Sequence, residues 1–420
     1  MKIFSRIVLI LVSVAVLSWF LPWLYALATP SPAGSPFCAF SPVNGKWIVS
    51  RSAPGEKPVI RILDSVAADG SIRGAEITRE ERDSLVPQMF YKELLAHDAL
   101  PESIAGKAVS AHELRTHELM LNASSRDVVK AQPGVWMMME SMPVRVDLSD
   151  ADQVFRFPAE GGIEFVDMAT NEVNPTRSAR FTKAMERRGF KFPGRDFSAN
   201  VTSRKAYDEG YLMIDDADKV YHVKQRAGRP YVAPVAMPGG VKASKVFILE
   251  EMNRDILGFI TDTENNAYFL EREGYSVMPL PVGKIDPRKE NILVMGNLFN
   301  FTFRITRGDT TRWIAVERTP EGYSLLGEYT YVAPRTTASV VADYIFPYVL
   351  SFTSTSDSLA YPRLGRWSAK ALWLNIVLAL VLAFAVRRRR SALAWSGVVL
   401  TLVCGVYAFI RLSFCAIERM

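Results

Sequence analysis

The chain has 420 residues, of which 49% are hydrophobic and 22% charged, and its mean hydropathy is +0.07. This balance excludes both a disordered chain and a channel that crosses the membrane many times. The apolar residues must therefore be concentrated in particular segments of the sequence.

The formal net charge is +6, and its distribution along the chain decides what it means. The two ends carry eight basic residues beside apolar runs and a single acid, Glu418, whereas the remaining sequence holds 42 bases and 43 acids. A nucleic-acid-binding surface needs a concentrated positive field. Because the sequence between the ends is nearly neutral, we expect no nucleic-acid partner. The terminal bases are Lys2, Arg6, Arg387, Arg388, Arg389, Arg390, Arg411 and Arg419.

The N-terminal apolar run extends from Ile7 to Ala28 and contains no charged residue. As a helix it would be about 33 Å long, enough for a hydrocarbon core of about 30 Å. We expect residues 1–28 to form a transmembrane anchor with a cytoplasmic N-terminus. Because Ala26-Leu27-Ala28 also fits a signal-peptide cleavage site, a removed signal peptide is the alternative.

Two further uncharged runs lie at the C-terminus, from Trp367 to Val386 and from Ser391 to Ile410, with Arg387 to Arg390 between them. We expect a transmembrane helical hairpin over residues 367–414, followed by a tail at 415–420. The positive-inside rule places the four-arginine turn in the cytoplasm together with Lys2 and Arg6. The sequence therefore predicts three transmembrane helices in the lipid bilayer and an exported middle region.

Three cysteines are too few for a disulfide scaffold. The predicted topology places Cys38 and Cys415 near the outer membrane surface and Cys404 within the last span. A disulfide between Cys38 and Cys415 would join the first span to the third. Separate free thiols are the alternative, because a disulfide needs a Cα separation of about 4.4 to 6.8 Å.

The exported region begins with a linker at residues 29–45 that is rich in proline and glycine. Short alternating runs at 46–50, 59–63 and 154–157 are typical of antiparallel strands, and Gln88 to His97 is predicted to be a helical insertion. These patterns predict a β-rich domain over residues 46–350 and a second linker at 351–366.

Glycines recur every 48 residues, at Gly162, Gly210 and Gly258. Each precedes an apolar alternating strand, an aspartate, a polar turn and a returning strand. Repeats of this length with several strands favour a β-propeller-like domain, and a sandwich of stacked hairpins is the alternative. The predicted fold class is membrane-anchored α+β, mostly antiparallel β, with helical insertions. The aspartates are Asp167, Asp215 and Asp262.

Short motifs between residues 90 and 335 carry a resemblance to a known family. With them the chain resembles an uncharacterised family of bacterial envelope proteins classed only as a domain of unknown function. The resemblance implies a leading span, a trailing hydrophobic hairpin and a loose association with ABC transporter components, but no catalytic residues. The motifs include Leu100-Pro101-Glu102-Ser103, Glu140-Ser141-Met142, Val146-Asp147, Ile163-Glu164-Phe165, Phe181-Thr182, Gly189-Phe190, Phe192-Pro193 and Tyr207-Asp208-Glu209-Gly210-Tyr211.

Three motifs suggest metal binding, but none has the required spacing. His112 and His117 are five residues apart, which separates them on a helix or a strand, so they cannot chelate zinc as a pair. Met137 to Met139 could offer thioethers to Cu(I) but also fit a buried strand. Residues 215–218 lack the glycine and glutamate of a calcium loop and fit a hairpin turn. We expect no cofactor.

A local basic excess lies between residues 177 and 195, where Glu186 is the single acid. Ser178 could cap a helix here and Gly189 could end it. Its polar side is a candidate site for an anionic partner, and a merely solvated helix is the alternative. The basic residues are Arg177, Arg180, Lys183, Arg187, Arg188, Lys191 and Arg195.

The chain lacks a phosphate-binding Gly-Lys-Ser/Thr loop, a dinucleotide fingerprint, a Gly-x-Ser-x-Gly elbow and a Cys-x-x-Cys pair. ATP hydrolysis by this chain is therefore not expected. We predict a non-enzymatic protein of the bacterial inner membrane whose periplasmic domain binds a partner or ligand. It would be an accessory subunit of an ABC-type complex, with the permease and ATPase as partners. The alternative is a membrane-anchored periplasmic hydrolase with its site in a propeller channel.

Overall fold

The computed structural model describes residues 2–29, 34–52, 55–66, 71–143, 147–354, 357–387 and 392–417. The chain divides into two compact units. The apolar unit comprises Met1–Gly34, Ser52–Pro58 and Ala333–Met420, and the β unit comprises Ser35–Arg51 and Val59–Val332.

The β unit is built from antiparallel sheets of two to five strands. Its first sheet has the order β1-β2-β3-β6, with β1 at Phe37–Phe40, β2 at Trp47–Arg51, β3 at Val59–Ile62 and β6 at Glu76–Ile77. The next has the order β10-β11-β12, at Trp136–Met137, Gln153–Arg156 and Glu164–Asp167. Two four-stranded sheets follow in chain order: β13 to β16, at Asp196–Ser198, Tyr211–Ile214, Val220–Arg226 and Arg229–Val235, and β17 to β20, at Ala243–Ile248, Ile256–Asp262, Ala267–Glu271 and Val277–Pro279.

The largest sheet has five strands in the order β24-β23-β22-β21-β9. They lie at Gly322–Val332, Thr310–Thr319, Phe301–Arg307, Asn291–Gly296 and Leu119–Ala123. Two small hairpins pair β4 with β5 and β7 with β8, at Ser65–Val66, Ile72–Arg73, Ser103–Ile104 and Lys107–Ala108. The helices of the unit are α2 (Arg79–Leu85), α3 (Pro87–Ala96), α4 (Ala111–Thr116), α5 (Ser125–Val128) and α6 (Pro175–Arg187), with 3-10 turns at Pro238–Gly240 and Glu273–Tyr275.

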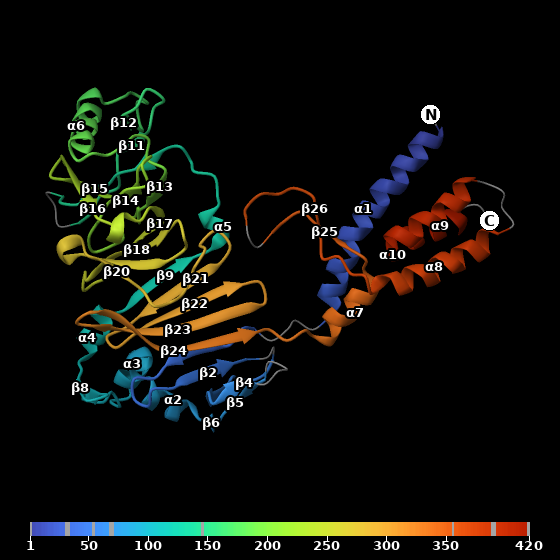
Figure 1. Cartoon of the computed structure of the whole chain (residues 1–420), viewed down its shortest axis with the longest axis horizontal. Helices are drawn as coiled ribbons and strands as arrows, with labels where there is room; N and C mark the ends of the chain where they lie inside the picture. Colours follow the sequence, from blue (N-terminus) through green and yellow to red (C-terminus); the bar gives the residue numbers. More distant parts are fainter. Residues whose placement is uncertain are drawn as a thin grey trace. The chain divides into compact units, whose positions relative to one another are not determined.

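The sheets of the β unit pack face to face in a series that can be followed through the colours of Figure 1. Alternate residues of a strand point to opposite faces. On β18, Phe259 therefore packs against Phe303 of the five-stranded sheet, while Ile260 packs against Leu212 of the β13–β16 sheet. All seven residues of β18 are buried. Coverage on both faces explains why residues 256–260 of this strand form an uninterrupted apolar run.

The described sheets do not close into a ring, so the expected propeller is not found. The reason lies at the first sheet, where Trp47 lies close to Gly327 of β24. On the opposite face, Ile48 and Ile60 pack against Val86 and the residues of α2 and α3. Because these helices already cover the outer apolar face, no further sheet can pack there. What the structure supports is an α+β unit of many antiparallel sheets.

The repeated aspartates form the same turn three times. One carboxylate oxygen of Asp215 accepts hydrogen bonds from the backbone N–H groups of Ala217 and Lys219, at 2.9 and 2.8 Å. Asp167 and Asp262 accept equivalent pairs of bonds two to four residues ahead. Asp215 is thus held as an Asx turn at the end of a strand, which agrees with the hairpin interpretation of residues 215–218.

Several local predictions lie within two residues of the observed elements, including α3, β2, β3 and β11. The first linker differs, because β1 lies inside it and pairs with β2. The second linker also contains strand residues, since β25 (Val349–Ser351) pairs with β26 (Arg363–Gly365). Residues 30–33, within the first linker, lie outside the described part of the chain.

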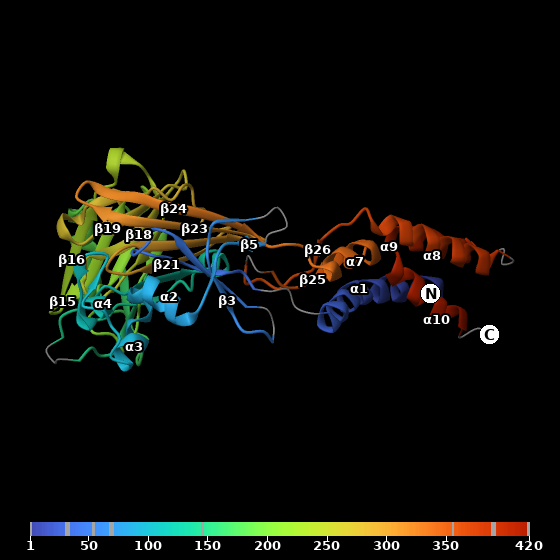
Figure 2. The ribbon, with the colours of Figure 1, turned by 90° about the horizontal axis from the view of Figure 1, so that it is seen from below.

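The apolar unit contains α1 (Lys2–Ala28), α7 (Thr337–Ile345), α8 (Ala371–Val386), α9 (Ala392–Cys404) and α10 (Val406–Ile417). Val14 of α1 belongs to one buried cluster with Phe346 and with Tyr407 of α10. The ring planes of Phe346 and Tyr407 are stacked, with centroids 6.0 Å apart. Figure 2 shows α1 beside α7 and α10 in this unit.

Among the described helices, only Ile7–Ala28 is both long and apolar enough to cross a membrane. Helix α8 has 16 residues, about 24 Å. The predicted span from Ser391 to Ile410 is divided into α9 and α10 at Gly405, whose φ of +57° lies in the left-handed region. A Cβ at Gly405 would lie 2.1 Å from Oδ1 of Asn375, so this close approach requires a glycine at the break. The expected turn residues Arg388 to Arg390 lie outside the described residues.

Two glycines of the β13–β16 sheet allow a matched test of close packing in the β unit. Gly210 and Gly228 have similar left-handed φ angles of +65° and +71°. A Cβ at Gly210 would lie 2.4 Å from Cβ of Lys224, whereas a Cβ at Gly228 would meet nothing within 4 Å. Both substitutions to alanine carry a backbone strain of about 1–2 kcal/mol, and only Gly210→Ala adds a clash of about 1–3 kcal/mol.

Gly210→Ala should therefore lower the free energy of unfolding more than Gly228→Ala. Denaturant unfolding of the full chain in detergent, followed by tryptophan fluorescence, measures both values. Equal losses would mean that close packing at Gly210 is not what requires a glycine there.

Candidate functional site

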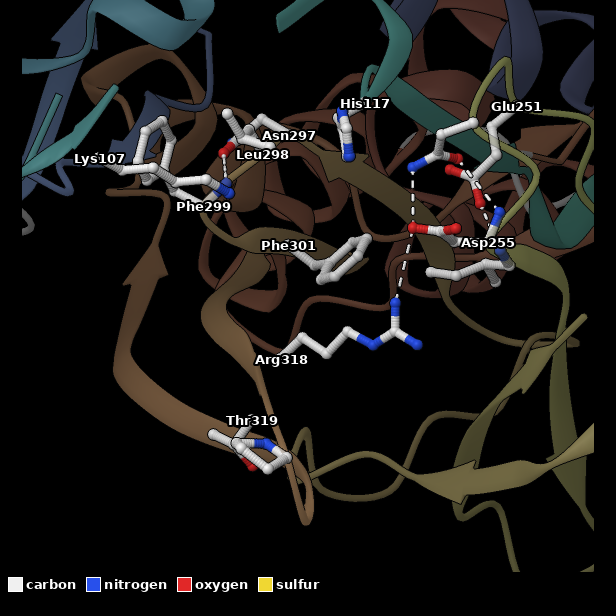
Figure 3. A pocket seen from close by; sticks show the side chains of 13 residues that line it. Lys107, His117, Glu251, Asp255, Asn297, Leu298, Phe299, Phe301, Arg318 and Thr319 are labelled. Carbon is white, nitrogen blue, oxygen red and sulfur yellow. Dashed lines mark hydrogen bonds and ion pairs between the residues drawn. The ribbon is translucent and has the colours of Figure 1, made fainter. Parts of the chain in front are cut away.

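The β unit has a cleft of about 380 Å³ lined by residues from five segments of the chain. Figure 3 shows charged, amide and aromatic side chains facing this space. Clefts of this size, with apolar walls and a few polar groups, are typical ligand sites. The lining residues are Lys107, His117, Glu251, Asn253, Asp255, Ile256, Asn297, Leu298, Phe299, Phe301, Arg318, Thr319 and Pro320.

One wall is the turn between β17 and β18, which is folded by its own polar side chains. Glu251 Oε1 accepts a hydrogen bond of 2.7 Å from the backbone N–H of Ile256. Asn253 Nδ2 donates to Asp255 Oδ2 at 3.2 Å. The hydroxyl of Tyr207 donates to the carbonyl oxygen of Glu251. These bonds hold Glu251 and Asp255 at the cleft (Figure 3).

A second wall is aromatic and comes from the turn between β21 and β22. Asn297 Oδ1 accepts hydrogen bonds from the backbone N–H groups of Phe299 and Asn300, at 2.9 and 3.1 Å, which tightens this turn. The ring of Phe301 packs against Phe269, with centroids 5.1 Å apart. Phe299 and Phe301 thus give the cleft a firmly packed apolar surface.

Arg318, near the end of β23, brings a guanidinium to the cleft and pairs with two carboxylates. Its guanidinium lies 3.0 Å from Glu271 Oε1 and 3.6 Å from Asp255 Oδ2. The side chain is 47% exposed, so water and a ligand can reach its remaining donors. In Figure 3 it extends into the cleft below Phe301.

His117 points into the cleft from the opposite side of Phe301 (Figure 3). Its Nδ1 lies 2.8 Å from the carbonyl oxygen of Glu113. Because a carbonyl oxygen can only accept, Nδ1 carries the proton in this pair, and Nε2 of the neutral ring is an acceptor. The imidazole can therefore accept a hydrogen bond from a ligand in the cleft.

The carboxyl of Glu251 is set apart by its environment. Burial raises its pKa to about 7, and the nearby charge of Asp255 acts in the same direction. The hydrogen bond from Ile256 and the charge of Arg318 oppose this rise in the pKa. Near neutral pH the carboxyl is therefore partly protonated and can either donate or accept a proton.

A buried polar network lies between the β13–β16 and β17–β20 sheets and is a second concentration of charge. The carboxylate of Glu209 binds Lys224 at 2.6 Å and also binds Arg272. His222 Nδ1 lies 2.8 Å from the hydroxyl of Tyr275, and burial lowers the pKa of His222 to about 4. Because these groups satisfy one another, we assign the network to holding the sheets together.

The basic residues of 177–195 are not equivalent in the structure. Arg177 is half-buried, stacks over Phe165 at 4.0 Å and donates to Gln153. Arg195 pairs with Asp218. Helix α6 therefore presents fewer available cations than expected, and its cap is Asn174 rather than Ser178. Besides Arg195, the exposed basic residues are Arg180, Lys183, Arg187, Arg188 and Lys191, of which Arg180 donates to the carbonyl oxygen of Gly228.

The predicted disulfide stays a prediction. Cys38 is a buried free thiol on β1, and burial raises its pKa well above its usual value. The side chain of Cys415 lies outside the described residues. Cys404 is also buried and free.

The sequence motifs with metal-binding potential lie apart from the cleft, except for His117. Met138 and Met139 are buried, and Met138 belongs to a core cluster with Phe155. His112 is exposed on α4. Within the part of the chain that is described, no group of three or more His, Cys, Asp or Glu is placed to hold a metal ion.

Sequence reasoning missed the cleft because its residues are spread from Lys107 to Pro320 without a local pattern. His117 was visible only as half of an unsuitable histidine pair. Glu251 and Arg318 become notable only when the fold brings them together and buries the carboxyl.

Glu251→Gln should remove one part of the pH dependence of stability. Between pH 4.5 and 7 the unfolded chain releases this proton while the folded chain keeps it, so the wild type loses stability as the pH rises. The variant keeps an acceptor for the N–H of Ile256. As the pH rises across this range, its free energy of unfolding should increase relative to that of the wild type by about 1–3 kcal/mol. Denaturant unfolding at several pH values measures the difference, and His222, present in both proteins, cancels. A constant difference would contradict the raised pKa.

Comparison with known proteins identifies the family. None of the curated proteins matches the chain. The model of a family described as Domain of unknown function (DUF4857) matches residues 37–316, more than half of the chain, and confirms the resemblance to a domain of unknown function. The match includes β1 and every cleft residue except Arg318, Thr319 and Pro320. The protein therefore belongs to the DUF4857 family.

Proposed function

We propose that this protein is a membrane-anchored binding protein of the bacterial inner membrane. Its β unit lies in the periplasm and binds a ligand or partner in the cleft, and the whole chain is an accessory subunit of an ABC-type transport complex. The observation that carries the binding role is the cleft itself, in which Arg318, His117 and Glu251 keep hydrogen-bonding capacity beside the aromatic wall.

The contacts of α1 support a retained anchor over a removed signal peptide. Val14 and Ser18 are buried. The hydroxyl of Tyr25 donates a 3.0 Å hydrogen bond to the carbonyl oxygen of Ala338 in α7. Cleavage of a signal peptide would remove these three residues, together with the contacts that they make with the rest of the apolar unit.

The three-span topology is retained as part of this proposal. Helix α8 alone is shorter than a hydrocarbon core of about 30 Å, but local bilayer thinning and snorkelling of the flanking Lys370 and Arg387 can compensate. Helices α9 and α10 together would form a kinked third span. Lys2, Arg6 and the four-arginine turn then lie in the cytoplasm, and the β unit lies in the periplasm.

An exposed apolar stripe on α8 supports docking to another membrane protein. Trp373, Val377, Leu380 and Phe384 are spaced by three and four residues and share one side of the helix. All four are exposed, whereas Asn375 and other residues of the helix are buried within the unit. Large aromatic side chains of this kind dominate many interfaces, and the permease of the complex is the proposed partner.

Gentle-detergent purification of the tagged full chain tests the complex. We expect a permease and an ATPase to copurify with the wild type. Trp373→Ala combined with Phe384→Ala should reduce their recovery at least tenfold, because truncation of an anchor typically costs about 2 kcal/mol or more. Leu359→Ala, at another exposed apolar position, is the control. Emergence of the wild type alone would exclude the accessory-subunit role.

Protease added to intact spheroplasts tests the orientation. The β unit should be digested from outside, whereas a cytoplasmic marker protein should survive. Protection of the β unit in spheroplasts, together with digestion after lysis, would place it in the cytoplasm and contradict the proposed topology.

A hydrolase is a second candidate, favoured by one observation. Glu251, with a pKa of about 7, lies in the same cleft as the exposed carboxylate of Asp255. A carboxylic acid beside a carboxylate is an arrangement used for acid–base catalysis. Turnover of glycoside, ester or phosphate substrates that is lost in both Glu251→Gln and Asp255→Asn would favour the enzyme over the binding protein.

A further inference from the structure

The apolar unit has a second cavity of about 340 Å³, which lies between the end of α1 and α7. Tyr25 and Pro22 of α1 face it from one side, and Ala342 of α7 faces it from the other. Phe346 and Val349 close its apolar part. Figure 2 shows α7 alongside this end of α1.

Arg366 lines the cavity and supplies its charge. The guanidinium donates to the carbonyl oxygen of Ser339 at 3.0 Å and to Asp343 Oδ1 at 3.2 Å. The backbone of Arg366 has a φ of +47°, which residues other than glycine rarely adopt. Backbone strain of this kind is found preferentially at functional sites, where the surrounding contacts maintain it.

The charges around Arg366 leave a net positive charge at this end of the cavity. Asp343 is buried and binds two arginines, Arg366 at 3.2 Å and Arg335 at 2.9 Å. One carboxylate between two guanidinium groups leaves one positive charge uncompensated. The side chain of Arg366 is 52% exposed, so its guanidinium can bind an anion without losing Asp343.

The position of the cavity along α1 selects the kind of anion. The apolar segment Ile7–Ala28 is long enough to cross a bilayer, and the cavity is lined by residues from Pro22 to Thr29. These residues form the last turns of α1 and the position directly after it, so they lie where acyl chains give way to headgroups. A cavity that is apolar at one end and cationic at the other matches a phospholipid at this depth.

We propose that this cavity binds one anionic phospholipid, with the phosphate on Arg366 and the start of an acyl chain against Tyr25 and Phe346. The site depends on the retention of α1 in the membrane. It does not depend on the cleft of the β unit or on the transport complex, so its failure would leave the binding role of the cleft unaffected.

Native mass spectrometry of the delipidated full chain in detergent, titrated with dioleoyl phosphatidylglycerol, tests the site. We expect one tightly bound lipid per wild-type chain. Arg366→Gln should weaken this binding about tenfold, because it removes a charge-assisted hydrogen bond. Arg335→Gln is the matched control, since Arg335 binds the same Asp343 but does not line the cavity.

Two soluble or neutral probes separate the sources of binding. Dioleoylglycerol, which lacks the phosphate, should bind at least tenfold more weakly than phosphatidylglycerol if the Arg366 contact matters. Glycerol 3-phosphate, which lacks acyl chains, should not displace the lipid at equal concentration. Displacement by glycerol 3-phosphate would overturn the proposal in favour of a soluble phosphate compound.

A second variant keeps the charge and fills the space. Ala338→Phe places a large side chain in the cavity and should also abolish the bound lipid, while helix content and elution volume report whether the chain is folded. Equal lipid binding by Arg366→Gln and Arg335→Gln would overturn the proposal. If Arg366→Gln does not fold, undiminished binding by a folded Ala338→Phe variant would overturn it instead.

Discussion

Burial of both faces of the β17–β20 sheet is the constraint on which the β unit depends. Phe259 and Ile260 are neighbours in β18, yet they belong to different hydrophobic clusters on opposite faces of the sheet. Most buried polar groups beside this sheet therefore pair with one another, as Glu209 does with Lys224 and Arg272. The polar groups that line the cleft lie instead in the turns and strand ends, where Glu251, Asp255 and Arg318 are found.

The buried network beside this sheet also positions the cleft. Arg272 binds Glu209 and donates a 2.9 Å hydrogen bond to the carbonyl oxygen of Arg254, within the turn that carries Asp255. Tyr207, two residues before Glu209, donates to the carbonyl oxygen of Glu251 in the same turn. The Tyr207–Tyr211 motif thus has a physical role, because it ties the Glu251 turn to the neighbouring sheet.

The sequence predicted what depends on neighbouring residues and missed what depends on distant ones. Alternation located β2 and β11 within two residues, and the recurring aspartates marked real turns. The prediction of a closed ring was wrong because α2 and α3 cover the first sheet. This cover leaves no periodic signal in the sequence. Hydropathy likewise could not reveal the break at Gly405, where Asn375 of another helix leaves no room for a Cβ.

Exposure separates the cations that hold the fold from those that can bind. Glu209 and Asp343 are both buried carboxylates that bind two cations each. Lys224, one partner of Glu209, is 12% exposed, and its charge is neutralised by that carboxylate within the protein. Its contribution is therefore structural. Arg366 and Arg318 are each about half exposed and line cavities, so some of their N–H donors can reach a ligand there. The same carboxylate–cation chemistry therefore stabilises the fold where it is enclosed and offers recognition where it borders a cavity.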